Sequence, residues 1–287
     1  MAINPDQIAY LDIEATYHGP EMMECIALVG RTYDVKEIIK RRGGHWFPDG
    51  KFWYLDADTD PERVDTIVDE LNAANESSKP IMPQKEHIPA DIYRIPEGWR
   101  ITVIGIMHEL LGPDRWLGDD SVIWSTQLVG DDITAERLKT ELGDDDVLVT
   151  YNGRIEPDNV RNSTGFDLPV IRAKTGADLE ADGGLHCVDL CPVCWHYSWE
   201  GREVDPRGKD HMKGGLKKIA QTLGLGSFDR YGSVGDGAES VAVYEQYELE
   251  QDPELFKQYC YYNLIDLEVL RDLTHWLVAR GYDWWNG

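Results

Sequence analysis

Two acidic side chains near the start of the chain share one side of a predicted strand. The stretch 8–16 is apolar apart from Asp12 and Glu14, and in a strand successive side chains point to opposite faces. Leu11 and Ile13 therefore share one face, while the two acids share the other. Carboxylates one pleat apart repel each other and favour a hard divalent cation, which prefers oxygen ligands. A solvated edge strand in a very acidic protein is the alternative interpretation.

Two further aspartates lie in settings that suit a site. Asp167 follows the predicted buried strand 146–152, at the end where open α/β sheets place their sites. Helix capping is the other explanation for it. Tyr262 and Asp266 are four residues apart in the predicted helix 252–280 and so share one face. An aspartate among apolar neighbours is costly to bury unless it is paired or bound to metal.

Together these motifs resemble the three Exo motifs of the DEDD 3′–5′ exonucleases, which have an RNase H-like fold. The motif segments are 11–16, then 151–153 with 165–171, and finally 262–266. The resemblance is closest to the proofreading domains of family-B DNA polymerases and to stand-alone microbial and viral exonucleases. Tyr262, four residues before the last aspartate, is typical of the DEDDy subgroup. Residues 154–164 lengthen a gap that is usually short in that family.

The resemblance implies a metal-dependent exonuclease that hydrolyses single-stranded DNA from its 3′ end and releases nucleoside 5′-monophosphates, in replication or repair. Its catalytic residues would be Asp12, Glu14, Asp167, Tyr262 and Asp266. The four carboxylates would hold two Mg²⁺ or Mn²⁺ ions. The tyrosine hydroxyl would orient the attacking water, because its ordinary pKa of about 10 makes it a poor base at neutral pH. Asn152 and Phe166 would contact the nucleic acid.

A small module is inserted after the first motif. Residues 21–78 predict a strand, a short helix, a hairpin and a second helix, and they contain the basic cluster of the chain. The segments 32–40, 43–46 and 51–54 resemble HARP-like modules of annealing helicases and phage proteins, which implies binding to DNA at junctions or single strands. The expected contacts are Lys40, Arg41, Arg42, Trp46, Lys51 and Trp53. The two tryptophans could equally form the small core of the hairpin.

The order of the elements predicts an α/β fold: an RNase H-like mixed sheet flanked by helices, with a small α+β inserted domain. We expect three parts, namely a discontinuous exonuclease domain of 1–20 and 98–287, a HARP-like insert of 21–78, and a proline-rich linker of 79–97. The glycine-rich stretch 227–240 predicts a mobile loop. His108 and Glu109, which end a predicted strand, are expected at the surface.

The chain is strongly acidic, with 53 Asp and Glu against 28 Lys and Arg and a net charge of −25. Small soluble domains usually carry a net charge of about 2–8 in magnitude. Salt screens the repulsion that such an excess creates, so we interpret it as adaptation to salt, in a halophile or a virus of one. An ordinary acidic protein or a neutralising partner would also explain it. Taken alone, the charge argues against a nucleic-acid ligand.

The sequence has neither an apolar run long enough to span a membrane nor a signal-like start, and its five cysteines do not suggest a disulfide framework. We expect a cytoplasmic protein, in the host cell if the source is viral, with no membrane partner. Cys191 and Cys194 could bind zinc only with a second pair of ligands, so buried thiols are the simpler interpretation.

DNA, at single-stranded 3′ ends, is the expected partner, together with a DNA polymerase or another replication protein. Two alternatives remain open. One is an RNA exonuclease on the same fold, because the motifs do not read the 2′-hydroxyl. The other is a non-catalytic DNA-binding accessory protein of replication.

Overall fold

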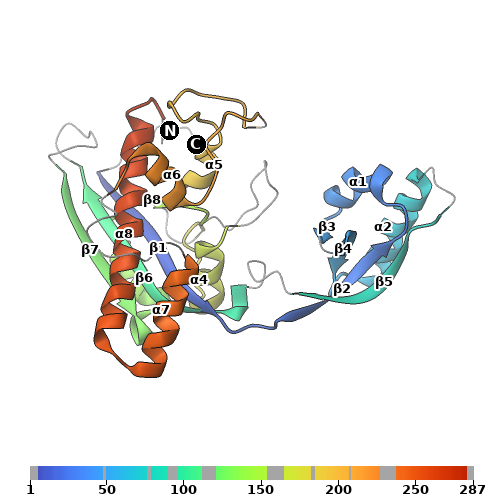
Figure 1. Ribbon diagram of the computed structural model, residues 1–287, viewed down its shortest axis with the longest axis horizontal. Helices are drawn as coiled ribbons and strands as arrows, with labels where there is room; N and C mark the ends of the chain where they lie inside the picture. Colours follow the sequence, from blue (N-terminus) through green and yellow to red (C-terminus); the bar gives the residue numbers. More distant parts are fainter. Residues whose placement is uncertain are drawn as a thin grey trace. The chain divides into compact units, whose positions relative to one another are not determined.

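The chain divides into two compact units, each with its own sheet and core. The larger unit comprises Met1–His18 and Tyr93–Gly287, and the smaller unit comprises Gly19–Ile92. The computed structural model (Figure 1) describes residues 6–47, 50–75, 79–89, 96–111, 121–153, 165–181, 185–206, 208–226 and 237–282.

The larger unit is built on a five-stranded mixed sheet with the order β7-β6-β1-β8-β9. Its strands are β1 (Gln7–Tyr17), β6 (Trp99–Leu110), β7 (Val122–Val129), β8 (Val147–Thr150) and β9 (His186–Asp189). The pairs β1–β6 and β6–β7 are antiparallel, whereas β1–β8 and β8–β9 are parallel. The predicted α/β fold with a mixed sheet flanked by helices is confirmed.

One long helix, α8 (Pro253–Val278), packs along β1 and β6 (Figure 1). Asp252 caps its first turn by accepting a hydrogen bond from the backbone N–H of Glu254 at 2.9 Å, and a proline occupies the first helical position, where its missing N–H costs nothing. Leu267 and Leu270 of this helix join Tyr10 of β1 in the main core. The apolar stripe thus fixes which residues of α8 face the central strand.

The remaining helices of the larger unit are α3 (Ala135–Glu141), α4 (Asp167–Thr175), α5 (Leu190–Cys194), α6 (Leu216–Leu223) and α7 (Gly237–Glu250). Helix α7 corrects the prediction of a loop over 227–240. Residues 227–236 lie outside the described residues, but the helix begins at 237. The stretch 238–250 contains neither glycine nor proline, and it packs against α8 and β1. No described helix combines the length and apolar character needed to cross a membrane.

The smaller unit has a four-stranded antiparallel sheet with the order β3-β4-β2-β5. Its elements are β2 (Met22–Val29), a 3₁₀ turn (Tyr33–Val35), α1 (Lys36–Arg41), β3 (His45–Phe47), β4 (Phe52–Asp56), α2 (Pro61–Ala74) and β5 (Met82–Pro89). Strand β5 corrects the predicted linker of 79–97, because it pairs with β2 over its whole length. The linker was predicted because of its prolines, but β5 is an edge strand, where the missing N–H of a proline is tolerated.

The placement of His108 and Glu109 at the surface is wrong, since they are 1% and 0% exposed. Strand β6 lies between β1 and β7 in the sheet, and Tyr10 of β1 and His275 of α8 contact the carboxylate of Glu109. The His108 ring stacks on Trp124 with centroids 5.0 Å apart, and its Nδ1 lies 3.0 Å from Oδ2 of Asp145. Both residues therefore belong to the interior of the larger unit.

Candidate metal centre

Three carboxylates from two elements meet in the larger unit. Asp12 and Glu14 come from β1 and Asp266 from α8, and one oxygen of each lies within 4.8 Å of the others. The alternation of β1 gives its two acids one face, and the apolar stripe of α8 turns Asp266 toward it. Residues from the two ends of the chain thus come close together, as a shared metal ion would require.

A fourth acid, Asp167, interacts electrostatically with this group. It is buried in the first turn of α4, and its pKa is raised well above the ordinary value by burial and then by the charges of Asp12, Asp189 and Asp266. Asp167 is not among the three residues whose carboxylate oxygens all lie within 4.8 Å of one another. We call Asp12, Glu14, Asp167 and Asp266 the acidic cluster.

Burial raises the pKa of every member of the acidic cluster, and repulsion by neighbouring acids raises the pKa of Asp12, Glu14 and Asp167 further. For Asp12 burial is the largest cause and the charge of Asp266 is the next. For Glu14 burial is followed by the charges of Asp12 and Asp266. Burial raises the pKa of Asp266 to about 6, although the nearby ammonium of Lys217 acts in the opposite direction. The cluster thus carries more negative charge than its surroundings balance.

Lys217 of α6 is a cation at this centre that the sequence analysis did not single out as a site residue. Its Nζ lies 3.4 Å from Oδ1 of Asp266 and 3.1 Å from the centroid of the Tyr262 ring. Both Lys217 Nζ and Asp266 Oδ1 are buried without a hydrogen-bond partner. The available signal was weak: a lysine on a short helix whose Ile219 and Ala220 face the core.

Asn263, which the sequence analysis also missed, holds Asp12. Its Nδ2 donates to Oδ2 of Asp12 at 2.9 Å and to the backbone oxygen of Asp12 at 3.2 Å. Its own Oδ1 accepts a hydrogen bond from Nε2 of Gln127 at 3.0 Å. Gly105 pairs with Asp12 in the sheet, and a Cβ there would lie 2.0 Å from Oδ1 of Asn263. The amide therefore needs the space that this glycine leaves.

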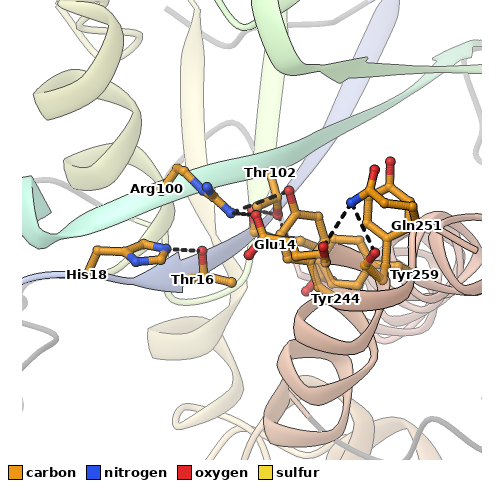
Figure 2. Close-up of polar contacts among 10 residues, drawn as sticks. Glu14, Thr16, His18, Arg100, Thr102, Tyr244, Gln251 and Tyr259 are labelled. Atoms are coloured by element: carbon orange, nitrogen blue, oxygen red, sulfur yellow. Dashed lines mark hydrogen bonds and ion pairs between the residues drawn. The ribbon is translucent and has the colours of Figure 1, made fainter.

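Glu14 is held by contacts of its own, some of which Figure 2 shows. Ser240 of α7 donates its hydroxyl to Oε2 of Glu14 at 2.9 Å. Thr102 donates to the backbone oxygen of Glu14 at 2.8 Å, and its Oγ1 lies 2.6 Å from the hydroxyl of Tyr259. Nearby, Arg100 lies over the ring of Tyr244, with 5.6 Å from its guanidinium carbon to the ring centroid. These contacts fix the backbone and the carboxylate of Glu14 together.

The two halves of the second motif meet in spite of the long stretch between them. The backbone N–H of Phe166 donates to the oxygen of Asn152 at 2.6 Å, and Asn152 donates its own N–H to Oδ1 of Asp189 at 2.7 Å. Asn152 is exposed and takes a left-handed conformation with φ of 63°. The half-buried Phe166 ring packs edge-on against Trp99, with centroids 4.7 Å apart. Both residues thus lie at the start of α4, beside Asp167.

The donor set fits a hard divalent cation. Carboxylate oxygens suit hard divalent ions such as Mg²⁺ and Mn²⁺, and Asp266 contributes a buried oxygen that lacks a hydrogen-bond partner. Within the described part of the chain, this is the only group of three His, Cys, Asp or Glu side chains close enough to share one ion. Cys191 and Cys194 are buried, form no disulfide and lie outside this group.

The sequence of the larger unit matches a family model. The RNase H superfamily model, RNase_H_2, covers residues 115–278. The chain belongs to the RNase H superfamily. Neither a curated protein nor a solved structure gives a significant match. Membership of the RNase H superfamily indicates a nuclease-type function, and the usual divalent-metal dependence of RNase H-like nucleases agrees with the carboxylates found here.

The predicted nucleic-acid contacts of the smaller unit separate into two groups. Four of them, Lys40, Trp46, Lys51 and Trp53, line one cleft. Arg42 instead forms an ion pair with Glu70 at 2.7 Å. Arg41 is exposed and does not line the cleft.

Proposed function

We propose that this protein is a metal-dependent 3′–5′ exonuclease that acts on single-stranded DNA and releases nucleoside 5′-monophosphates. The observation that carries the proposal is the convergence of Asp12, Glu14 and Asp266, with Asp167 close enough to share their electrostatics. Tyr262 supports the exonuclease subtype, because it lies one helical turn before Asp266, as in the DEDDy pattern.

Divalent ions bound by the acidic cluster would supply an activated water and would neutralise charge on the phosphodiester. The residues of the chain provide the positioning. Asn263 fixes the orientation of Asp12, and Ser240 fixes that of Glu14. Lys217 places a positive charge beside Asp266 and the Tyr262 ring, where it would favour the negative charge that develops on the reacting phosphate. The hydroxyl of Tyr262 would orient the attacking water.

The test uses single-stranded DNA labelled at either end and incubated with Mg²⁺ or with EDTA over a series of salt concentrations. A 3′-end label released first as a mononucleotide, and a 5′-end label that gives a descending ladder, are expected. Asp12→Asn and Asp266→Asn should reduce the rate about 1,000-fold or more. Glu254→Gln is the matched control, because it removes an exposed acid from the same helix.

Three outcomes would contradict the proposal. Full activity of Asp12→Asn would show that another site hydrolyses DNA. Hydrolysis of RNA but not DNA would support an RNA exonuclease on the same fold. Retention of DNA without degradation at any salt concentration would support a non-catalytic accessory protein.

A further inference from the structure

The smaller unit contains a cleft of about 630 Å³ whose lining is positively charged. Its cations are Arg31, Lys36, Lys40 and Lys51, and none of the described lining residues is acidic. The whole chain carries a net charge of −25. The cleft is thus positively charged although the chain as a whole is negative. This local positive charge favours an anionic ligand.

The positive charge of this cleft is largely available to a ligand. Lys36 and Lys51 form no ion pair within the described residues. Arg31 pairs with Asp34 and Lys40 with Glu37, each at 3.2 Å. Because these two pairs are exposed, each contributes little stability and is easily exchanged for a phosphate.

Aromatic rings lie among these cations. Tyr33 and Trp46 are 73% and 45% exposed, which is unusual for such large apolar side chains. Trp46 faces Trp53 on the paired strand, with ring centroids 5.5 Å apart, and Trp53 is anchored in the core of the unit. Lys36 lies 5.0 Å from the centroid of the Tyr33 ring. The exposed rings thus occupy defined positions beside lysine ammonium groups.

We propose that this cleft binds unpaired nucleotides of single-stranded DNA, with bases stacked on Trp46 and Tyr33 and phosphates held by Lys36 and Lys51. Stacking on aromatic side chains and contacts from lysines to phosphates are together the chemistry of single-strand binding. The bases of a duplex are already paired and stacked, so they cannot offer a free face to either ring. The volume of the cleft lies in the range of ordinary ligand sites. The site belongs to a different unit from the acidic cluster and does not depend on hydrolysis.

The experiment measures binding by the full chain in EDTA, which prevents metal-dependent degradation. Labelled oligo-dT, the same strand in a duplex, an oligoribonucleotide and free dTMP are compared by fluorescence anisotropy, and tryptophan quenching reports stacking. We expect oligo-dT to bind more tightly than the duplex and dTMP, with quenching of tryptophan emission.

Variants separate stacking from charge. Trp46→Ala should weaken binding of oligo-dT roughly 5- to 100-fold without changing its salt dependence, and Trp46→Phe should restore most of the affinity. The Lys36→Gln/Lys51→Gln double variant should weaken binding and lower the slope of log K against log salt by about 1–2. Arg63→Gln/Lys85→Gln removes the same charge from the smaller unit outside the cleft and should have little effect.

An equal loss of affinity in the Arg63/Lys85 control would overturn the proposal, because it would show a general effect of charge. Duplex binding as tight as that of the single strand would also overturn it. Binding of dTMP as tight as that of oligo-dT, with the same sensitivity to Trp46→Ala, would assign the cleft to free nucleotides. The assay is made in EDTA and measures binding alone, so failure of the proposed hydrolysis leaves this test valid.

Discussion

The larger unit treats two of its groups of buried carboxylates in opposite ways. Glu109 is fully buried, but it accepts hydrogen bonds from Tyr10 at 2.7 Å, Ser121 at 2.7 Å and His275 at 2.9 Å. Arg271 adds a guanidinium nitrogen 3.5 Å from Oε1. Burial alone raises the pKa of Glu109, but the hydrogen bonds and the charge of His275 outweigh it and lower the pKa to about 2.

The acidic cluster has four acids and, among the residues that the structure describes, one adjacent cation, Lys217; the pKa of each acid is raised. The larger unit therefore uses buried acids in two ways. Around Glu109 the fold supplies its own compensation, as a structural ion pair requires. Around the acidic cluster the fold supplies too little positive charge to balance the carboxylates, as is expected of a site that binds a cation from solution.

The strongest test of this distinction removes one acid from the cluster. Asp12→Asn should abolish metal-dependent hydrolysis, with a loss of about 1,000-fold or more. In EDTA its free energy of unfolding should stay equal or rise by about 1 kcal/mol, because a repelling charge is gone. Activity assays and urea unfolding measure the two effects. A large loss of stability in EDTA would mean that Asp12 has a structural role like that of Glu109.

The opposite pattern is expected at Glu109. Glu109→Gln should lower the free energy of unfolding by about 2–3 kcal/mol, because His275 and Arg271 lose their common partner. The activity of the folded fraction should change by no more than about twofold, since this residue is outside the acidic cluster. Urea unfolding and the specific activity at low temperature separate these effects. Unchanged stability would show that the network contributes nothing net.

The pH dependence of stability should also separate the two sites. A raised pKa means that the folded acidic cluster binds protons that the unfolded chain has released, so in EDTA this contribution falls as pH rises from about 4 to 7. Mg²⁺ should remove most of that fall, and Asp266→Asn should reduce it. The lowered pKa of Glu109 has the opposite sign: its contribution is complete above pH of about 4.5 and is lost as pH falls toward 2. Thermal unfolding in EDTA and in Mg²⁺ measures both, and a flat profile in EDTA would contradict the first.

A smaller effect is expected from the support of Asp12. Asn263→Ala should lower kcat about 10-fold with little change in KM, because Asp12 loses its orienting hydrogen bond. Gly105→Ala should act in the same way by displacing the Asn263 amide. The double variant should be no worse than the worse single variant, since both act through one contact. Additive losses in single-turnover assays would show two independent effects.

The sequence sufficed for features that depend on local periodicity. Alternation along one strand paired Asp12 with Glu14, and helical spacing paired Tyr262 with Asp266. The contacts of Lys217 and Asn263 could not be predicted, because they depend on how α6 and α8 pack on the sheet. Tertiary pairing also explains the error over 82–89: an edge strand that contains prolines differs from a linker only by its hydrogen bonds to β2.

The pairing of the end of β1 with the start of β6 shows where the smaller unit is inserted into the larger one. Tyr17 and Trp99 are direct partners in the β1–β6 pair, and the backbone N–H of His18 donates to the oxygen of Gly98 at 2.8 Å. The chain therefore leaves and re-enters the larger unit at neighbouring points, where a tight turn could close the same hairpin. Chain ends this close are what domain insertion and excision tolerate. The smaller unit could therefore be added by a single in-frame insertion at the tip of a hairpin. A short turn could replace it without changing the β1–β6 register that positions Asp12.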